Sequence, residues 1–141
     1  MSMEMIAFVH SEKLPNRQQW QDAIDAHKVP LTLDPELDLA TDSGFSPCQL
    51  RGELSGFELF VEKVGCFSYD LQRLNIAGRD IAIVFRWGSY LVEGACVMGA
   101  TLALASSCDA VIYYSDDDQI LSQNELEDDL AQFLQELDQP K

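Results

Sequence analysis

The chain has 141 residues, 24 of them Asp or Glu and 9 Lys or Arg, which gives a formal net charge of −15 at pH 7. A polyanion of this strength is repelled by phosphates and by anionic lipids, which excludes direct binding to nucleic acid or to a membrane surface. Because 47% of the residues are apolar, disorder is also excluded, and the length predicts a single folded domain over residues 1–141.

The N-terminal part of the chain predicts one helix between two strands. Residues 5–9 are a short apolar run typical of a strand. Pro15 suits the first turn of a helix, and apolar residues at helical spacing follow it as far as Pro30. Residues 31–39 alternate between Leu and polar residues, but Pro35 interrupts them. This segment is therefore an edge strand or an extended loop.

A β-hairpin is predicted next. Its strands are residues 48–54 and 57–64, and Ser55-Gly56 provides a two-residue turn. Residues 43–47 contain Ser, Gly and Pro, which favour another turn just before the hairpin. On the second strand Phe60 falls on the otherwise polar face, so we expect that face to be partly covered.

The strongest strand signal covers residues 80–87, whose continuous apolar run predicts a central strand buried on both faces. One helical turn is expected before it, over residues 70–75. A long helix rich in small residues is expected after it, from Ser89 to about residue 107, and it is apolar on most sides and therefore buried. Gly94 and Gly99 lower its intrinsic stability by about 1 kcal/mol each, so we expect them to allow close approach to the sheet.

Residues 109–114 predict another buried strand, and residues 120–121 begin a short one. Ser122 and Glu125 have the spacing of a capping box, which predicts the start of the last helix. The resulting order is β-α-β-β-β-α-β-α, with one extra strand left open. It predicts an α+β fold with an antiparallel or mixed sheet and helices packed on one side. A ferredoxin-like variant is compatible with this order.

The acidic residues are concentrated in two segments. Residues 116–141 carry nine acids and one Lys, and residues 22–42 carry six acids and one Lys. These segments are either solvated surface that maintains solubility or a surface complementary to a cationic protein. In the second case opposite fields would accelerate encounter roughly 10- to 1,000-fold. The acids expected to contact such a partner are Asp34, Glu36, Asp38, Asp116, Asp117, Asp118, Glu127 and Asp128.

An alternative site is suggested by Arg79, Arg86 and Glu93, which lie close in sequence to apolar segments. Because a buried charge needs a partner, Arg86 and Glu93 are expected to form a structural ion pair. Alternatively, the three residues would line a pocket in which an Arg binds an anionic group and Glu93 acts as a base. A small-molecule-binding protein or an enzyme would use such a pocket.

Other catalytic and metal signals are weak, so we expect no catalytic residue, no metal and no cofactor. The Asp116–Asp118 turn lacks the Gly and the distal Glu of a calcium-binding EF-hand loop. No nucleophile motif such as GxSxG is found. The cysteines form no CxxC pair and are expected to be reduced, buried thiols of a cytoplasmic protein. They are Cys48, Cys66, Cys96 and Cys108.

Several short stretches resemble a family of small, acidic, uncharacterised bacterial proteins. They are residues 43–48, 55–58, 85–88 and 103–114 with the acidic turn that follows, so the likeness spans roughly residues 30–125. Proteins of this size and acidity also resemble bacterial toxin-immunity proteins, which bind and neutralise a cognate toxin. The resemblance implies a bacterial source and assigns no functional residue.

Charge clustering without catalytic machinery leads to the main hypothesis. The chain is expected to be a non-enzymatic, cytoplasmic protein that captures a basic protein partner, such as a nuclease toxin. The pocket near Arg79, Arg86 and Glu93 is the alternative. A structural homodimer, formed through a sheet edge or through the face that carries Phe60, is the third hypothesis.

Overall fold

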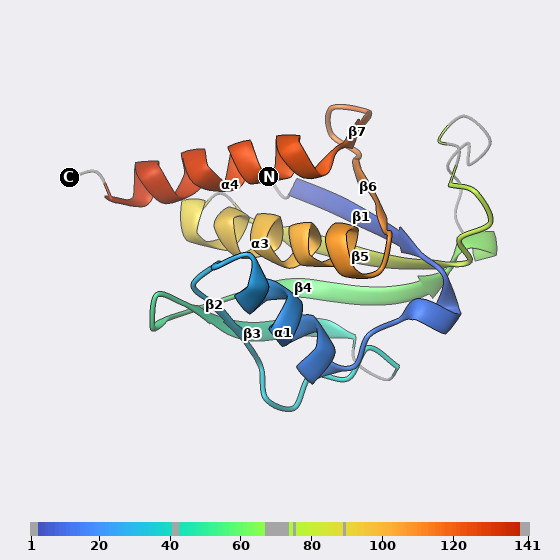
Figure 1. Ribbon diagram of the computed structural model, residues 1–141, viewed down its shortest axis with the longest axis horizontal. Helices are drawn as coiled ribbons and strands as arrows, with labels where there is room; N and C mark the ends of the chain where they lie inside the picture. The colour runs from blue at the N-terminus through green and yellow to red at the C-terminus, as the bar shows by residue number, and fades with distance from the viewer. Residues whose placement is uncertain (1–2, 41–42, 67–73, 75, 89, 139–141) are drawn as a thin grey trace.

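A computed structural model describes residues 3–40, 43–66, 74, 76–88 and 90–138, and within them the α+β prediction is confirmed. A seven-stranded antiparallel sheet has the order β2-β3-β4-β5-β1-β6-β7, and the three α-helices of the described part cover one of its faces (Figure 1). The elements are β1 (Met3–Val9), α1 (Arg17–Ala26), β2 (Leu31–Leu33), β3 (Gly44–Leu50), β4 (Glu53–Lys63), β5 (Ile81–Trp87), α3 (Leu91–Ser107), β6 (Val111–Tyr114), β7 (Gln119–Leu121) and α4 (Gln123–Asp138).

The connectivity contains a ferredoxin-like core. The elements β1, α1, β4, β5, α3 and β6 follow the order β-α-β-β-α-β, and their strands lie as β4-β5-β1-β6 with every neighbouring pair antiparallel. Strands β2 and β3 are inserted between α1 and β4 and extend one edge of the sheet. Strand β7 and helix α4 extend the other edge. In the segment left open between an edge strand and a loop, residues 31–33 form the edge strand β2, and the residues after them form turns.

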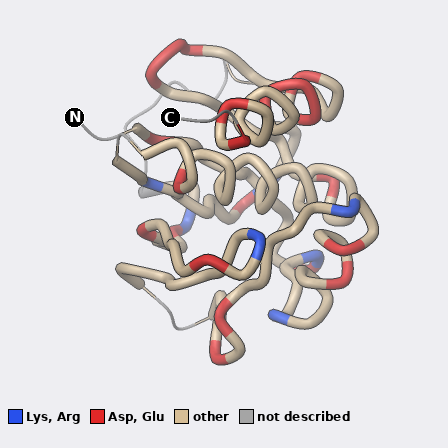
Figure 2. Tube along the Cα trace, turned by 90° about the vertical axis from the view of Figure 1, so that its left-hand side faces the viewer, with Lys and Arg blue, Asp and Glu red and all other residues tan. Residues whose placement is uncertain are grey.

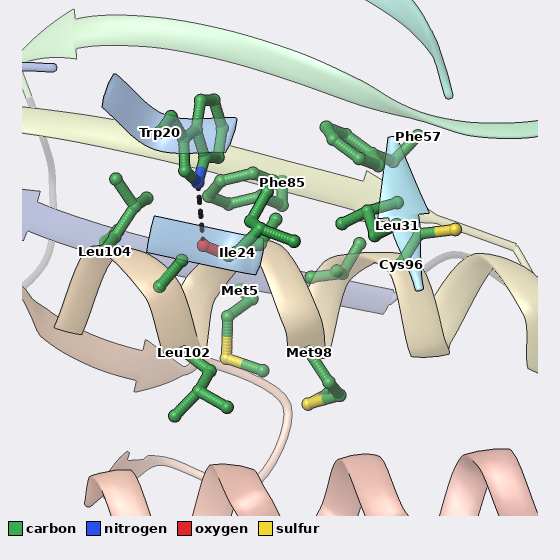
Figure 3. Close-up of a cluster of buried hydrophobic side chains, with 14 of the residues drawn as sticks. Met5, Trp20, Ile24, Leu31, Phe57, Phe85, Cys96, Met98, Leu102 and Leu104 are labelled. Atoms are coloured by element: carbon green, nitrogen blue, oxygen red, sulfur yellow. Dashed lines mark hydrogen bonds between the residues drawn. The ribbon is translucent and has the colours of Figure 1, made fainter. Parts of the chain in front are cut away.

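The main core lies between the sheet and the helices. Alternate residues of β5 face this core, and Phe85 packs there edge-on against Trp20 of α1, with the ring centroids 6.0 Å apart (Figure 3). The indole nitrogen of Trp20 donates to the carbonyl of Ala100 in α3 at 3.0 Å. This bond joins α1 to α3, and it satisfies a polar group that would otherwise be costly to bury.

A smaller apolar cluster covers the opposite face of the sheet. Ala82 and Val84 of β5 belong to it, so β5 is buried on both faces as predicted. Leu74 and Ile76, from the connection between β4 and β5, also belong to it, and Phe60 packs against it. The expected cover over the Phe60 face is therefore confirmed. The helical turn expected over residues 70–75 lies outside the described residues except for Leu74.

The predicted hairpin turn is wrong. The chain reverses at Arg51-Gly52, whose φ angles are 55° and 80°, as a two-residue turn between antiparallel strands requires. Ser55 and Gly56 instead lie within β4, where Gly56 is paired with Pro47 of β3. Both dipeptides contain a glycine that suits a tight turn. The turn forms at Arg51-Gly52, where both residues have left-handed backbone angles.

The turn expected over residues 43–47 is also wrong, because β3 begins at Gly44. Phe45 of this strand lies across β4, and it leaves no room for a side chain at Gly56. A Cβ added there would lie 2.3 Å from Phe45 Cζ and 2.8 Å from the carbonyl oxygen of Ser46. Gly56 therefore serves close packing between two strands and not chain reversal.

The glycines of α3 allow close approach to the sheet, as predicted, and closer still to residues outside it. A Cβ at Gly94 would lie 3.3 Å from Trp87 of β5, and one at Gly99 would lie 3.6 Å from Leu31 of β2. A Cβ at Gly94 would lie 2.9 Å from the Phe133 ring of α4, and one at Gly99 would lie 2.7 Å from Val29, just after α1. Helix α3 therefore packs closely against α4, against the connection that follows α1, and against strands of the sheet. Its residue Ser89, the predicted start, lies outside the described residues, and the helix itself begins at Leu91.

Helix α4 begins with the predicted capping box. The Ser122 hydroxyl accepts a hydrogen bond from the Glu125 amide at 3.2 Å, and the Glu125 carboxylate accepts one from the Ser122 amide at 3.1 Å. These bonds satisfy two amides that helical bonding leaves unpaired. They also fix the position at which α4 starts beside the β6–β7 hairpin.

Candidate functional site

The structure separates the predicted acidic residues into two groups at opposite edges of the sheet. Asp34, Glu36 and Asp38 follow β2, whereas the other group lies on the β6–β7 turn and on α4. Six strand spacings of about 4.8 Å place these edges about 29 Å apart. In Figure 2 the two groups appear near the bottom and the top of the molecule. A small partner would therefore contact one group at a time.

The group after β2 has a local structural role. The Asp34 carboxylate accepts a hydrogen bond from the amide of Glu36 at 3.1 Å, and the Asp38 carboxylate accepts one from the amide of Ala40 at 2.9 Å. Arg17 of α1 also donates to the carbonyl of Asp34 at 3.2 Å. The two bonds that the carboxylates accept from amides two residues later are those of Asx turns. They explain the presence of Asp at these positions by the local chain conformation, without a binding partner.

The second group converges from two elements that are adjacent in space. Asp116, Asp117 and Asp118 form the β6–β7 turn, and Glu127 and Asp128 lie on α4. Asp118 accepts a hydrogen bond from the Tyr113 hydroxyl at 2.6 Å, which ties its carboxylate to the sheet. Asp117 and Asp128 line one shared cleft between the turn and the helix.

This acidic cleft has a volume of about 410 Å³. Its walls are apolar and aromatic, and the rings of Trp87 and Tyr114 stack at 6.3 Å with an angle of 20° between their planes. Among the described residues, no Lys or Arg lines it. Its carboxylates come from Asp117, Glu125, Asp128 and Asp129.

Burial, together with the crowding of carboxylates, raises the pKa of two groups in the cleft. The pKa of Asp129 is raised by burial first and then by the negative charges of Glu125 and Asp128. The pKa of Tyr114 is also raised, by burial and by the charges of Asp116, Asp117 and Asp129 in that order. Both groups therefore experience a negative field, which a cation entering the cleft would relieve.

Sequence reasoning missed half of the carboxylates in the cleft and its aromatic wall. Glu125, Asp128 and Asp129 have the i, i+3, i+4 spacing that places side chains on one helical face, so this signal was available. No comparable signal connects them to Trp87 and Tyr114. That contact depends on the sheet order, in which β1 separates β5 from β6.

The residues of the alternative pocket are not all brought together. Arg79 precedes β5 and Arg86 lies near its end, so about 23 Å of extended chain separates them. The Arg79 side chain is only 9% exposed. It donates to the carbonyls of Ile76 and Asp109 at 2.7–2.9 Å and to the Asp109 carboxylate at 3.1 Å. These contacts hold the start of β5 to the α3–β6 connection.

Arg86 and Glu93 do line one hollow, of about 260 Å³, but the expected ion pair between them is replaced by other contacts. Arg86 forms an ion pair at 2.9 Å with Glu4, the residue opposite it on the adjacent strand β1, and its guanidinium lies 5.3 Å from the centre of the Phe60 ring. Glu93 accepts a hydrogen bond from the amide of Gly88 at 3.2 Å.

The cysteines contribute no open site in the described part of the chain. Cys48, Cys96 and Cys108 are free thiols and buried, in agreement with the prediction for these three. The side chain of Cys66 lies outside the description. Within the described residues, His, Cys, Asp and Glu side chains are not grouped as metal ligands would be. No described helix combines the length and apolarity needed to cross a membrane.

Comparisons with known proteins do not assign this chain. No model of a protein family matches it, and no curated protein matches it either. The acidic cleft must therefore be interpreted from its own geometry.

Proposed function

We propose that this chain is a non-enzymatic binding protein that captures a basic protein partner at the edge formed by α4 and the β6–β7 turn. Its mode of action would be that of the immunity proteins that neutralise bacterial toxins in the cytoplasm. The observation that supports the proposal is the acidic cleft, in which carboxylates from two elements surround an aromatic wall.

The physical basis is attraction followed by burial. The field of the clustered carboxylates would steer a cationic surface to this edge and raise the association rate. The apolar wall would then give up water to the partner, as the centres of protein interfaces do. The acids after β2, whose bonds close local turns, are left out of this interface.

The test compares two triple variants with equal charge changes. The first is Asp117→Asn, Glu127→Gln and Asp128→Asn, and the second is Asp34→Asn, Glu36→Gln and Asp38→Asn. Asn keeps the side-chain oxygen that accepts the turn hydrogen bonds, so the second variant is a matched control. Each protein is immobilised, exposed to an extract of the source organism, and the retained proteins are identified.

We expect a basic protein that the wild type and the control variant retain and the first variant loses. With that protein purified, its association rate should fall as ionic strength rises, and it should be at least about tenfold slower for the first variant. The proposal fails if no basic protein is retained, or if both triple variants lose it equally.

A further inference from the structure

The acidic cleft combines two kinds of surface that one ligand must match. Asp128 and Asp129 on α4 face Asp117 on the β6–β7 turn, so negative charge rims both sides. The stacked rings of Trp87 and Tyr114 line the same cleft. A fitting ligand therefore carries positive charge at the end of an apolar or planar stem, because a bare metal ion would leave the aromatic wall without a contact.

A second, independent observation concerns the indole nitrogen of Trp87. This side chain is only 5% exposed. Its N–H group takes part in none of the hydrogen bonds between described residues, and the nitrogen is not one of the fully enclosed polar atoms that lack a partner, so it keeps contact with solvent. The nitrogen lies beside Gly94 at the Phe133 ring, another wall of the cleft: a Cβ added to Gly94 would be 3.3 Å from it. Trp20, the other indole, donates to the carbonyl of Ala100. The Trp87 N–H group therefore remains available to an acceptor that a ligand brings into the cleft.

We propose that the acidic cleft binds an arginine side chain of the protein partner together with a neighbouring backbone carbonyl. The guanidinium would lie between the carboxylates and against the aromatic rings, since it is planar, donates several hydrogen bonds and stacks on aromatic faces. The carbonyl would accept from the indole of Trp87. This inference rests on the proposed function and deepens it by naming the group that is recognised.

The carbonyl distinguishes an arginine residue from other cations. A polyamine has the charge and the apolar stem but no acceptor for the indole N–H. An arginine within a peptide has all three features in one unit.

The experiment uses the full chain and follows the two indole N–H resonances by NMR. The probe is N-acetyl-arginine methylamide, and its neutral isostere, N-acetyl-citrulline methylamide, is the ligand control. Trp20, whose N–H is already bonded within the core, is the internal control. Asp128→Asn is compared with Glu127→Gln. Both substitutions remove one negative charge from the same part of α4, but Asp128 lines the cleft and Glu127 does not.

We expect the Trp87 resonance to shift with the arginine probe while that of Trp20 stays fixed, and Asp128→Asn to weaken binding about tenfold more than Glu127→Gln. The inference is overturned if the citrulline probe binds equally well, if spermidine shifts the Trp87 resonance at a lower concentration than the arginine probe does, or if the two variants behave alike.

The two proposals can fail separately. If a basic partner is captured at this edge but the arginine probe leaves the Trp87 resonance unmoved, the inference alone is wrong. If the probe binds in the cleft but no basic protein is retained, the proposed function fails while the site remains.

Discussion

Asp129 shows how the ionisation of a single residue in the cleft affects the stability of the fold. Burial and two neighbouring carboxylates raise its pKa in the folded state, so its ionisation opposes folding at neutral pH. This penalty decreases as the pH falls through the raised pKa and is lost below the ordinary pKa of the unfolded state. We expect Asp129→Asn to raise the melting temperature at pH 7 and to have a smaller effect at pH 4. The melting temperatures of the wild type and the variant, measured by thermal unfolding at both pH values, test this. An unchanged or lower melting temperature of the variant at pH 7, or a rise of the same size at both pH values, would contradict it.

Arg79 gives the opposite case, a charged residue whose contacts stabilise the fold. Its guanidinium, only 9% exposed, donates to the carbonyls of Ile76 and Asp109, and hydrogen bonds from a charged group contribute more to stability than neutral ones do. Arg79→Met should lower the free energy of unfolding by about 1–3 kcal/mol. Arg86→Met, at a residue whose side chain is 48% exposed, should lower it by less than about 1 kcal/mol. Urea unfolding distinguishes the two, and equal losses would show that Arg79 has no special structural role.

Among the elements, the β3–β4 hairpin depends on the missing side chain of Gly56. The Gly56→Ala variant should lose about 1–3 kcal/mol of unfolding free energy, because the backbone oxygen of Ser46 cannot move away as easily as the Phe45 ring. Gly65→Ala is the matched control, since a Cβ there meets nothing within 4 Å. Its unfolding free energy should change by less than about 0.5 kcal/mol. Loss of stability only in the control variant would refute this account of the hairpin.

The same hairpin shows which structural elements local sequence patterns can predict and which they cannot. The central strand and the capping box of α4 were predictable because their signals are local: a continuous apolar run, and the spacing of Ser122 and Glu125. The turn was not, since Arg51-Gly52 and Ser55-Gly56 both suit a chain reversal, and the pairing of Gly56 with Pro47 decides between them. Local patterns do not contain that pairing.

At the scale of the whole molecule, sheet order decides which acids act together. The concentration of acids in two segments was visible in the sequence, but their placement at opposite edges follows from β2 and β7 being the two terminal strands. The cleft follows from the same order, because it requires α4 to lie beside the end of β5, which carries Trp87. Patterns within segments could therefore predict where the acidic residues are concentrated. They could not predict that the acids of α4 and the β6–β7 turn line one cleft with Trp87 and Tyr114.

The central claim is that the edge formed by α4 and the β6–β7 turn, and not the acidity of the molecule as a whole, attracts a basic partner. Backbone amide shifts measured during titration with a hexa-arginine peptide test it most directly. The account predicts that the shifts concentrate on residues 116–129 and that they weaken as salt is added. Shifts that centre on residues 34–38, or that are spread evenly over the acidic positions of the chain, would contradict it.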